Sequence, residues 1–448
     1  MKKLFTKIFF SLTVFGFCIS IASLPALAKL PGIDPSKISD MSDFDPNKPT
    51  YSGDDTIKIG LVEAFSGPAA INGQYYRLTT HWVAHDINKR GGIYVDGKMR
   101  KVEVVLGNSM GKPSMVKKAA ERLILRDKVD FLWGTAGSHN TKILQQVSKK
   151  YKKVFMNPMS LSDSLHDGKN FSRYTFRTTL NTTMLGRAMA YFYAKRPETR
   201  FYILNQDYGF GHALAGTFKA GLKEFKPNAE IVGENFHPLF LKDFAPFITK
   251  VKASNAQVIF TGDWDPDGAN LIRQARGLGL NLPFAHIYAD SYTTGRAIGG
   301  PAGAGNVNAN DYMITVDTPA QKKFNEIWNK RWKQGYDKPY GRPTYTWPST
   351  IFGRTSEATY WMLDVVRRAG TTDADKVIKT WEGDKWVGFS GVMEMRACDH
   401  QVIRDMFVTE FIFPNKWFKD SAAYGDPVVM PRNIAVSPVP KDLKRCNR

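Results

Sequence analysis

Cysteine is scarce in this sequence, and no long apolar run occurs after residue 24. The 448 residues include three cysteines that lie far apart, so we expect no zinc site with cysteine ligands. Beyond the N-terminal run, no segment is long and apolar enough to span a bilayer. The remainder of the chain is therefore expected to be soluble.

Catalytic signatures are also missing. The chain has no H-E-x-x-H motif and no visible pair of nucleophile and base. Gly299–Gly305 is rich in glycine, alanine and proline, but it lacks the G-x-G-x-x-G spacing between a strand and a helix. We expect a protein that is not an enzyme and that needs no cofactor or metal.

Acidic residues are outnumbered. The chain carries 62 lysines and arginines against 42 acids, for a formal net charge of +20. Such an excess can indicate nucleic-acid binding. The basic residues are dispersed, however, and no basic block alternates with aromatic residues. We therefore expect no nucleic-acid partner.

What is present begins with an N-terminal leader. Residues 1–28 open with three lysines, continue in the uncharged run Ile8–Leu24 and end in Ala26-Leu27-Ala28, whose small residues suit a cleavage site. We expect a cleaved signal peptide and a protein that works outside the cytoplasmic membrane. The alternative is an uncut membrane anchor. Cys18 follows the large Phe17, so we assign it to the apolar run rather than to lipid attachment. Cleavage would leave 420 residues and a charge of +17, because the leader carries three lysines and no acid.

Two cysteines remain after cleavage, Cys398 and Cys446. A pair of cysteines in an exported chain usually forms a disulfide. That bond would tie the C-terminal tail to the body of the protein. The alternative is two buried free thiols.

Residues 29–54 form the segment that follows the leader. They contain four prolines among aspartate, serine and asparagine. This composition predicts an extended arm or linker that does not pack as an element.

Strand-length apolar runs then alternate with helix-length amphipathic runs. The first series predicts strands at 57–62, 102–106, 129–133 and 154–156, and helices at 72–88, 113–126 and 138–149. The second series predicts helices at 182–194, 212–225, 244–252 and 267–276, and strands at 201–204, 230–236, 258–261 and 284–289. Later helices are expected at 320–333 and 349–369. This alternation, in a chain too long for one core, predicts an α/β fold with two doubly wound parallel-sheet lobes.

Short motifs recur in order along these elements. They are Ile57–Val62, Ser66-Gly67-Pro68, Asn72-Gly73-Gln74, Ile87-Asn88 with Gly91-Gly92, Ala119–Ile124, Phe176–Thr179, Tyr208-Gly209 with Gly211, Asp243-Phe244, Leu271–Gly279 and Asp399-His400-Gln401. This series resembles the branched-chain amino-acid-type (type I) periplasmic binding proteins, the solute receptors of ABC importers. The resemblance spans roughly residues 55–412.

The resemblance implies two lobes that are joined by a hinge and close on a small-molecule ligand. Lobe 1 would comprise residues 55–179 and 314–388, lobe 2 would comprise 180–313 and 389–412, and a tail would follow at 413–448. We expect a periplasmic monomer that delivers its ligand to an ABC permease in the inner membrane. The alternative is a ligand-sensing subunit of the same fold, which signals rather than transports.

In lobe 1 the resemblance implies two loops that hold the ligand. The first places Ser138 beside Gly137 and His139, where a turn entering a helix offers a hydroxyl and free N–H groups to an anion. Ser138 can at the same time be an N-cap. The second loop contributes four candidates: Met159, Ser160, Leu161 and Ser162.

Several positions depart from the pattern of amino-acid binders. Such proteins often carry threonine at Leu161 and a small residue at Met159, although methionine also suits ordinary core filling. The segment after Thr179 lacks an acid that many members have. Asn72, another candidate contact, stands where some relatives have an aromatic residue. These departures favour an aromatic acid, another carboxylate, an amide or a modified amino acid over a plain branched-chain amino acid.

Lobe 2 offers three candidates. Tyr208 matches a family position whose ring covers the ligand, and the alternative is a packed turn residue. Trp264 follows the predicted strand 258–261 at its C-terminal end. Asp290 ends the predicted strand 284–289 and resembles an acid that neutralises a ligand amine.

The Asp-rich segment 263–268 spells the start of a calcium-binding loop. Pro266 interrupts that loop, and Gln274 stands where a glutamate ligand belongs. We therefore expect a loop at the end of a strand rather than a cation site.

Overall fold

The computed structural model of the protein describes residues 32–48, 50–291, 294–295, 298–333, 347–419 and 421–446. The predicted signal peptide, residues 1–28, lies outside this part of the chain. Within it, no helix combines the length and apolar character needed to cross a bilayer.

The first α/β unit is built on a six-stranded sheet. The strand order is β2-β3-β1-β4-β5-β6; β1 pairs in parallel with β3 and β4, and β2 turns back antiparallel on β3. The elements are β1 (Thr56–Glu63), α1 (Ala70–Lys89), β2 (Ile93–Val95), β3 (Lys98–Asn108), α2 (Pro113–Leu125), β4 (Phe131–Gly134), α3 (Ser138–Tyr151), β5 (Phe155–Asn157) and β6 (Thr175–Arg177).

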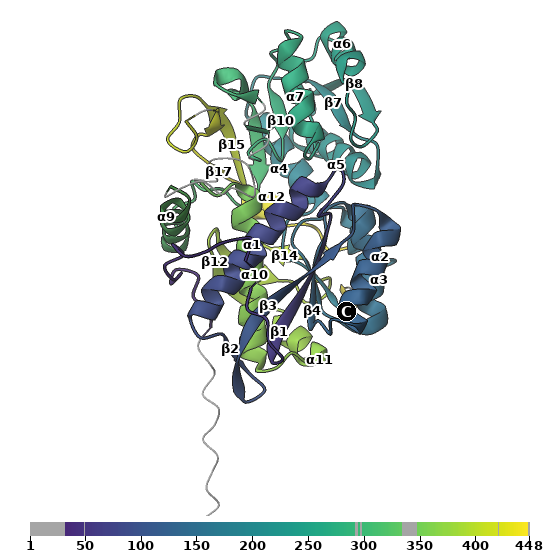
Figure 1. Ribbon diagram of the computed structural model, residues 1–448. Helices are drawn as coiled ribbons and strands as arrows, with labels where there is room; N and C mark the ends of the chain where they lie inside the picture. The colour runs from purple at the N-terminus through teal and green to yellow at the C-terminus, as the bar shows by residue number, and fades with distance from the viewer. Residues whose placement is uncertain are drawn as a thin grey trace, which may run out of the picture. The chain divides into compact units, whose positions relative to one another are not determined.

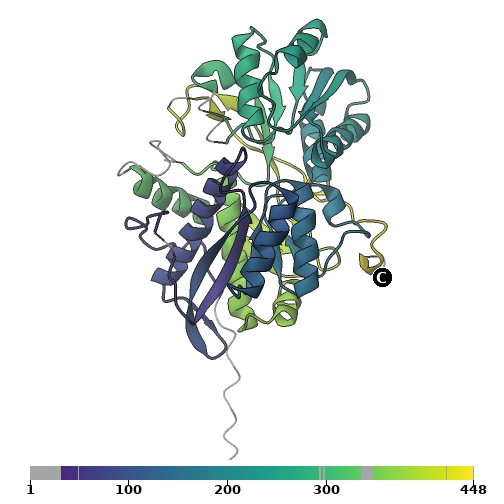
Figure 2. The same cartoon turned by 45° about the vertical axis from the view of Figure 1, so that its right-hand side comes forward.

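Helices cover both faces of this sheet (Figure 1 and Figure 2). On one face, Ile57, Ile59 and Leu61 of β1 pack in the core that α1 shares with α10 (Thr350–Ala369). On the other face, Val62 packs with residues of α2 and α3. Side chains of a strand alternate between its faces, so an unbroken apolar run is what a strand covered on both sides requires.

The second unit has the same plan. Its sheet runs β16-β15-β11-β10-β9-β7-β8, and β7, β8, β9, β10 and β11 are parallel. The elements are α4 (Thr182–Ala194), β7 (Arg200–Gln206), α5 (Gly209–Phe225), β8 (Glu230–His237), α6 (Ala245–Ala253), β9 (Val258–Phe260), α7 (Asp267–Gly277), β10 (Phe284–His286), β11 (Val307–Asn310), β15 (Phe407–Ile412) and β16 (Ala423–Tyr424). The α4 and α5 side chains pack on one face of the sheet, and α6 and α7 on the other. The predicted fold class is confirmed.

The chain passes between the two units three times: after β6, after β11 and before β15. The second passage leads to α9 (Pro319–Lys333), α10, α11 (Ala374–Trp381) and a small sheet of β12 (Lys385–Gly388), β13 (Gly391–Met395) and β14 (Val402–Ile403). The second sheet therefore joins segments that are distant in the sequence, β7–β11 and β15–β17, whereas the first sheet is continuous and only its helical cover includes a distant segment, α10.

The return to the second unit comes later than the expected residue 389. β13 pairs with β12, and Gln401 bridges to Arg177 at the end of β6. The hairpin is held to the first unit because Trp386 stacks on Trp361 of α10. The second sheet is rejoined at β15.

The expected tail, residues 413–448, adds to the second sheet and then reaches back. β16 and β17 (Val428–Val429) pair with β15, and α12 (Arg432–Ala435) follows. Cys398 and Cys446 are joined by a disulfide, with their Cα atoms 4.9 Å apart. The bond fastens the end of the chain beside the turn that precedes β14.

The N-terminal arm packs more closely than expected. Residues 32–48 contain no helix or strand, yet Ile33, Ile38, Met41 and Phe44 are buried in the core of the first unit. The Phe44 ring meets Trp82 of α1 edge-on, with 5.2 Å between ring centroids. The expectation of an unpacked spacer is therefore wrong. The apolar residues of the arm are irregularly spaced, so they show neither helical nor strand periodicity, yet each side chain packs into the core.

Candidate ligand-binding site

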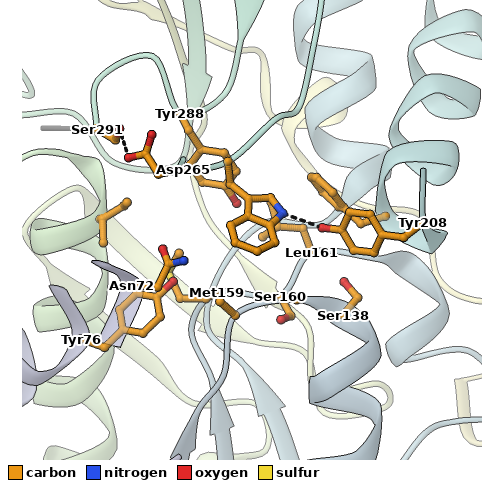
Figure 3. A pocket seen from close by; sticks show the side chains of 15 residues that line it. Asn72, Tyr76, Ser138, Met159, Ser160, Leu161, Tyr208, Asp265, Tyr288 and Ser291 are labelled. Atoms are coloured by element: carbon orange, nitrogen blue, oxygen red, sulfur yellow. Dashed lines mark hydrogen bonds between the residues drawn. The ribbon is translucent and has the colours of Figure 1, made fainter. Parts of the chain in front are cut away.

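A cavity lies where the strand ends and helix starts of both units meet. The space between its atoms, including the part open to solvent, amounts to about 470 Å³. Seven of the predicted site residues line it: Asn72, Ser138, Met159, Ser160, Leu161, Tyr208 and Trp264. Figure 3 shows side chains from both units around it. The sequence analysis therefore assigned to one site residues that lie up to 192 positions apart in the chain.

Ser138 stands at the first position of α3, directly after β4. Gly137 precedes the helix with a φ of 82°, a left-handed conformation that glycine adopts without strain, and it supplies no side-chain cap. The Ser138 hydroxyl accepts a long hydrogen bond from the Ser162 N–H at 3.4 Å. Its own proton has no acceptor among the described residues, so the hydroxyl and the helix start present donors to the cavity.

The serines of the second loop are engaged within the protein. Ser160 Oγ donates to the Thr135 carbonyl at 2.8 Å and lies 2.5 Å from the donating Thr141 hydroxyl. The Ser160 N–H is bonded to Asn157. Ser162 does not line the cavity, and its hydroxyl pairs with Ser164 at 2.9 Å. Ser160 therefore shapes the cavity, while the donor available in lobe 1 is Ser138.

Tyr208 and Trp264 form the aromatic wall that the second unit contributes. The Trp264 indole N–H donates to the Tyr208 hydroxyl at 2.9 Å, drawn as a dashed line in Figure 3. Phe240 meets the Trp264 ring edge-on, with 5.6 Å between centroids. These contacts hold the indole against the cavity before any ligand arrives.

Two further predicted residues lie outside the lining. His139 is exposed, and its ring meets Tyr208 edge-on at 5.7 Å between centroids. Asp290 accepts hydrogen bonds from the Thr350 N–H at 2.7 Å and from the Tyr424 hydroxyl at 2.5 Å. β10 ends at His286, four residues before Asp290, so the chain has already turned and this acid caps α10 instead.

The sequence reasoning missed several lining residues: Tyr76, Ala136, Gly137, Phe210, Asp265, Tyr288, Ser291 and Ile351. Helical spacing could have found Tyr76, because it lies one turn after Asn72 on α1. Ile351 could not have been found in this way, because only tertiary packing brings the start of α10 to the cavity.

The aspartates of segment 263–268 point to separate partners. Asp263 is 2.7 Å from the His237 ring nitrogen, and Asp267 accepts from the Phe240 N–H at 2.8 Å. Asp265 accepts from the Ser291 hydroxyl at 2.6 Å. Within the described residues no group of three His, Cys, Asp or Glu side chains is arranged to hold a metal ion.

Glu63 lies behind the cavity at the end of β1. It is 1% exposed, and its two oxygens accept from the Ala64 N–H at 2.8 Å and the Ala136 N–H at 2.6 Å. Burial raises the pKa of the Glu63 carboxyl to about 7, although these N–H groups act in the opposite direction. The side chain fixes Ala136, and with it the loop that leads to Ser138.

A buried charge cluster joins the three passages between the units. Asp311, in the second passage, accepts from Thr179 and Leu180 of the first, both at 3.1 Å. Arg354 of α10 donates to Asp311 at 3.2 Å, and Arg404 of the third passage lies 3.6 Å away. Burial acts to raise the pKa of Asp311, but Arg404 and Arg354 lower it below its usual value.

The cluster is completed by Glu357, which accepts from Arg404 at 2.5 Å. It also reaches the cavity, since Arg354 lies 3.6 Å from the sulfur of Met159. The hinge and the cavity lining are therefore in direct contact.

Gly107–Gly111 has the G-x-S-x-G spacing of a hydrolase nucleophile, in a strand-to-helix turn. Ser109 is fully buried, and its hydroxyl accepts the Gly111 N–H at 3.3 Å. No histidine is bonded to it among the described residues. The spacing therefore belongs to a packed turn without a base.

Comparison with known proteins decides the family. The family model described as periplasmic binding protein matches residues 56–415. The chain belongs to this family. Its match runs from β1 to just past β15 and so covers the first sheet and all of the second except β16 and β17; the type I periplasmic binding protein fold predicted from the motif series is confirmed.

Individual relatives of this periplasmic binding protein are distant. The Leu/Ile/Val-binding protein homolog 4 of Brucella abortus (strain 2308) is 26% identical over 385 residues, covering 82% of this chain and 87% of the relative. The Brucella ovis leucine-, isoleucine-, valine-, threonine- and alanine-binding protein, in its closed conformation, has a TM-score of 0.74 at 22% identity, covering 86% of this chain and 98% of that one. A solute-binding protein of an ABC transporter from Rhodopseudomonas palustris BisB5, in complex with 3,4-dihydroxybenzoic acid, has a TM-score of 0.69 at 21% identity, covering 83% and 99%. Both structures share the fold of this chain.

Proposed function

We propose that this chain is the periplasmic receptor of an ABC importer, and that it holds a small carboxylated ligand between its two units. The observation that carries the proposal is the cavity itself. It is lined from both units: Ser138 and the start of α3 offer hydrogen-bond donors on one side, and the Trp264 ring, whose N–H is bonded to Tyr208, forms an aromatic wall on the other. A helix start with a free hydroxyl suits a carboxylate.

Closure of the hinge would couple binding to delivery. A ligand that touches both units is held fully only when they are together, so binding favours the closed population. The closed form would then be what an inner-membrane permease recognises. A monomer suffices for this cycle, and the leader would place it in the periplasm.

The names of three relatives support two classes of ligand as candidates. Two names refer to aliphatic amino acids and one to an aromatic acid. Met159 and Leu161 add apolar surface to the lining. We therefore expect leucine or valine to raise the melting temperature less than an aromatic or other organic acid does. A thermal-shift panel in which leucine or valine gives the largest shift would contradict this expectation.

Measuring ligand uptake by cells distinguishes an importer receptor from a sensing subunit. A strain that lacks the gene should lose high-affinity uptake of the acid that stabilises the purified protein most. Normal uptake in that strain, together with a lost transcriptional response to the acid, would instead favour the sensing subunit.

A further inference from the structure

Asn72 carries a buried amide that the protein leaves unsatisfied. It is 4% exposed and lines the cavity in the first turn of α1. Its side-chain nitrogen has no acceptor among the described residues. Burying an amide without a partner costs about 1–3 kcal/mol, so a ligand oxygen at this point would recover that cost.

The position of Asn72 is fixed by the backbone. The neighbouring Gly73 lies against the loop after β1, where an added Cβ would stand 2.2 Å from the Ala64 carbonyl oxygen. Only glycine permits this close approach, which packs the first turn of α1 against the loop and places Asn72 at the cavity.

Asn72 and Ser138 mark two polar ends of the cavity. Figure 3 shows them on opposite sides of the view, with Met159 and Ser160 between them. The lining also includes Leu161 and Trp264. A ligand that satisfies this arrangement has an apolar, ring-like middle and a polar group at each end.

The acids near the cavity are already engaged. Asp265 accepts from the hydroxyls of Ser291 at 2.6 Å and Thr294 at 2.8 Å. Asp290 is bonded to Thr350 and Tyr424 outside the lining. These bonds use part of the accepting capacity of Asp265, the acid of the lining, so an amino-acid ligand is compared directly in the test below.

We propose that the ligand is an aromatic carboxylate with a hydrogen-bond-accepting oxygen on the ring, opposite the carboxylate, and that Asn72 selects it by donating to that oxygen. The inference rests on the proposed function, because the ligand carboxylate is assigned to Ser138 and the start of α3. Asn72 thereby becomes the residue that separates substituted from unsubstituted ring acids.

The test measures three ligands on the wild type and on two variants. Dissociation constants of benzoate, 4-hydroxybenzoate and leucine are measured by titration calorimetry on the full mature chain. Asn72→Leu removes the amide at similar size. Gln74→Leu, an exposed amide two residues along α1, is the matched control.

Wild type and Gln74→Leu should bind 4-hydroxybenzoate about tenfold more tightly than benzoate, the worth of one buried hydrogen bond. In Asn72→Leu the preference should disappear, with benzoate affinity retained. An equal preference in Asn72→Leu and wild type would overturn the inference. Tight leucine binding without either ring acid would overturn it and leave the receptor function standing, whereas binding of no small acid of any class would remove both.

Discussion

At the scale of single residues, Glu63 makes stability depend on pH. Burial raises the pKa of its carboxyl from the ordinary 4.5 to about 7. The folded protein therefore holds a proton that the unfolded chain releases between these values. The free energy of unfolding contributed by this group falls as the pH rises from 4.5 to 7, and it changes little outside that window.

Replacing Glu63 with glutamine should remove this dependence. Glutamine is uncharged at every pH but keeps only one of the two acceptor oxygens, so Glu63→Gln should be less stable than wild type near pH 4.5 and should gain roughly 3 kcal/mol relative to wild type by pH 8. Urea denaturation at the two pH values measures the difference. Glu230→Gln, at an exposed position, is the control and should not alter the slope. A wild type that gains stability relative to Glu63→Gln as the pH rises would contradict the assignment.

The surroundings of Glu63 could not be predicted from the sequence. A glutamate after a strand suggests a solvent-exposed end, yet Glu63 is held by the N–H of Ala136, 73 positions away. Asp290 shows the reverse case. It was assigned to the cleft by resemblance, but a strand three residues shorter than predicted turned it toward α10.

At the scale of elements, the charge cluster should hold the three passages together. Asp311→Asn removes one of the two acids in the cluster. The buried side chains of Arg354 and Arg404 then have only Glu357 as an acidic partner within the cluster. Breaking a buried ion pair in this way should lower the free energy of unfolding by about 3–5 kcal/mol. Denaturant titration of the purified variant measures the loss.

The matched control for this change is an exposed ion pair. Glu234→Gln breaks the contact with Lys219, in which the lysine side chain is 41% exposed. Such a pair contributes under about 1 kcal/mol. Equal losses in Asp311→Asn and Glu234→Gln would show that the cluster does not stabilise the passages.

The helices and strands were the features that the sequence predicted best. The helix predicted at 182–194 matches α4 at both ends, because Asn181 caps it and an apolar stripe runs along it. The short strands β6 and β11 were missed: β6 contains Thr175 and Arg177, and β11 contains Asn308 and Asn310, so neither is the apolar run that revealed the equally short β5 and β9. The arm at Ile33–Phe44 was misjudged for a related reason: packing against α1 and α10, not local pattern, orders it.

At the scale of the whole molecule, the account depends on one ligand being held from both units. Ser138 reaches the cavity from the first unit and Trp264 from the second. Sequence motifs could place both residues near strand ends. They could not supply Asn72 as an unpaired donor or Arg354 as the link from hinge to cavity, because both depend on contacts across the fold.

The dissociation constant of the most stabilising acid, compared among wild type, Ser138→Ala and Trp264→Leu, tests this claim most directly. The account predicts that each substitution weakens binding about tenfold or more, because each removes one side of the contact. Wild-type affinity in either variant would contradict a ligand held between the two units.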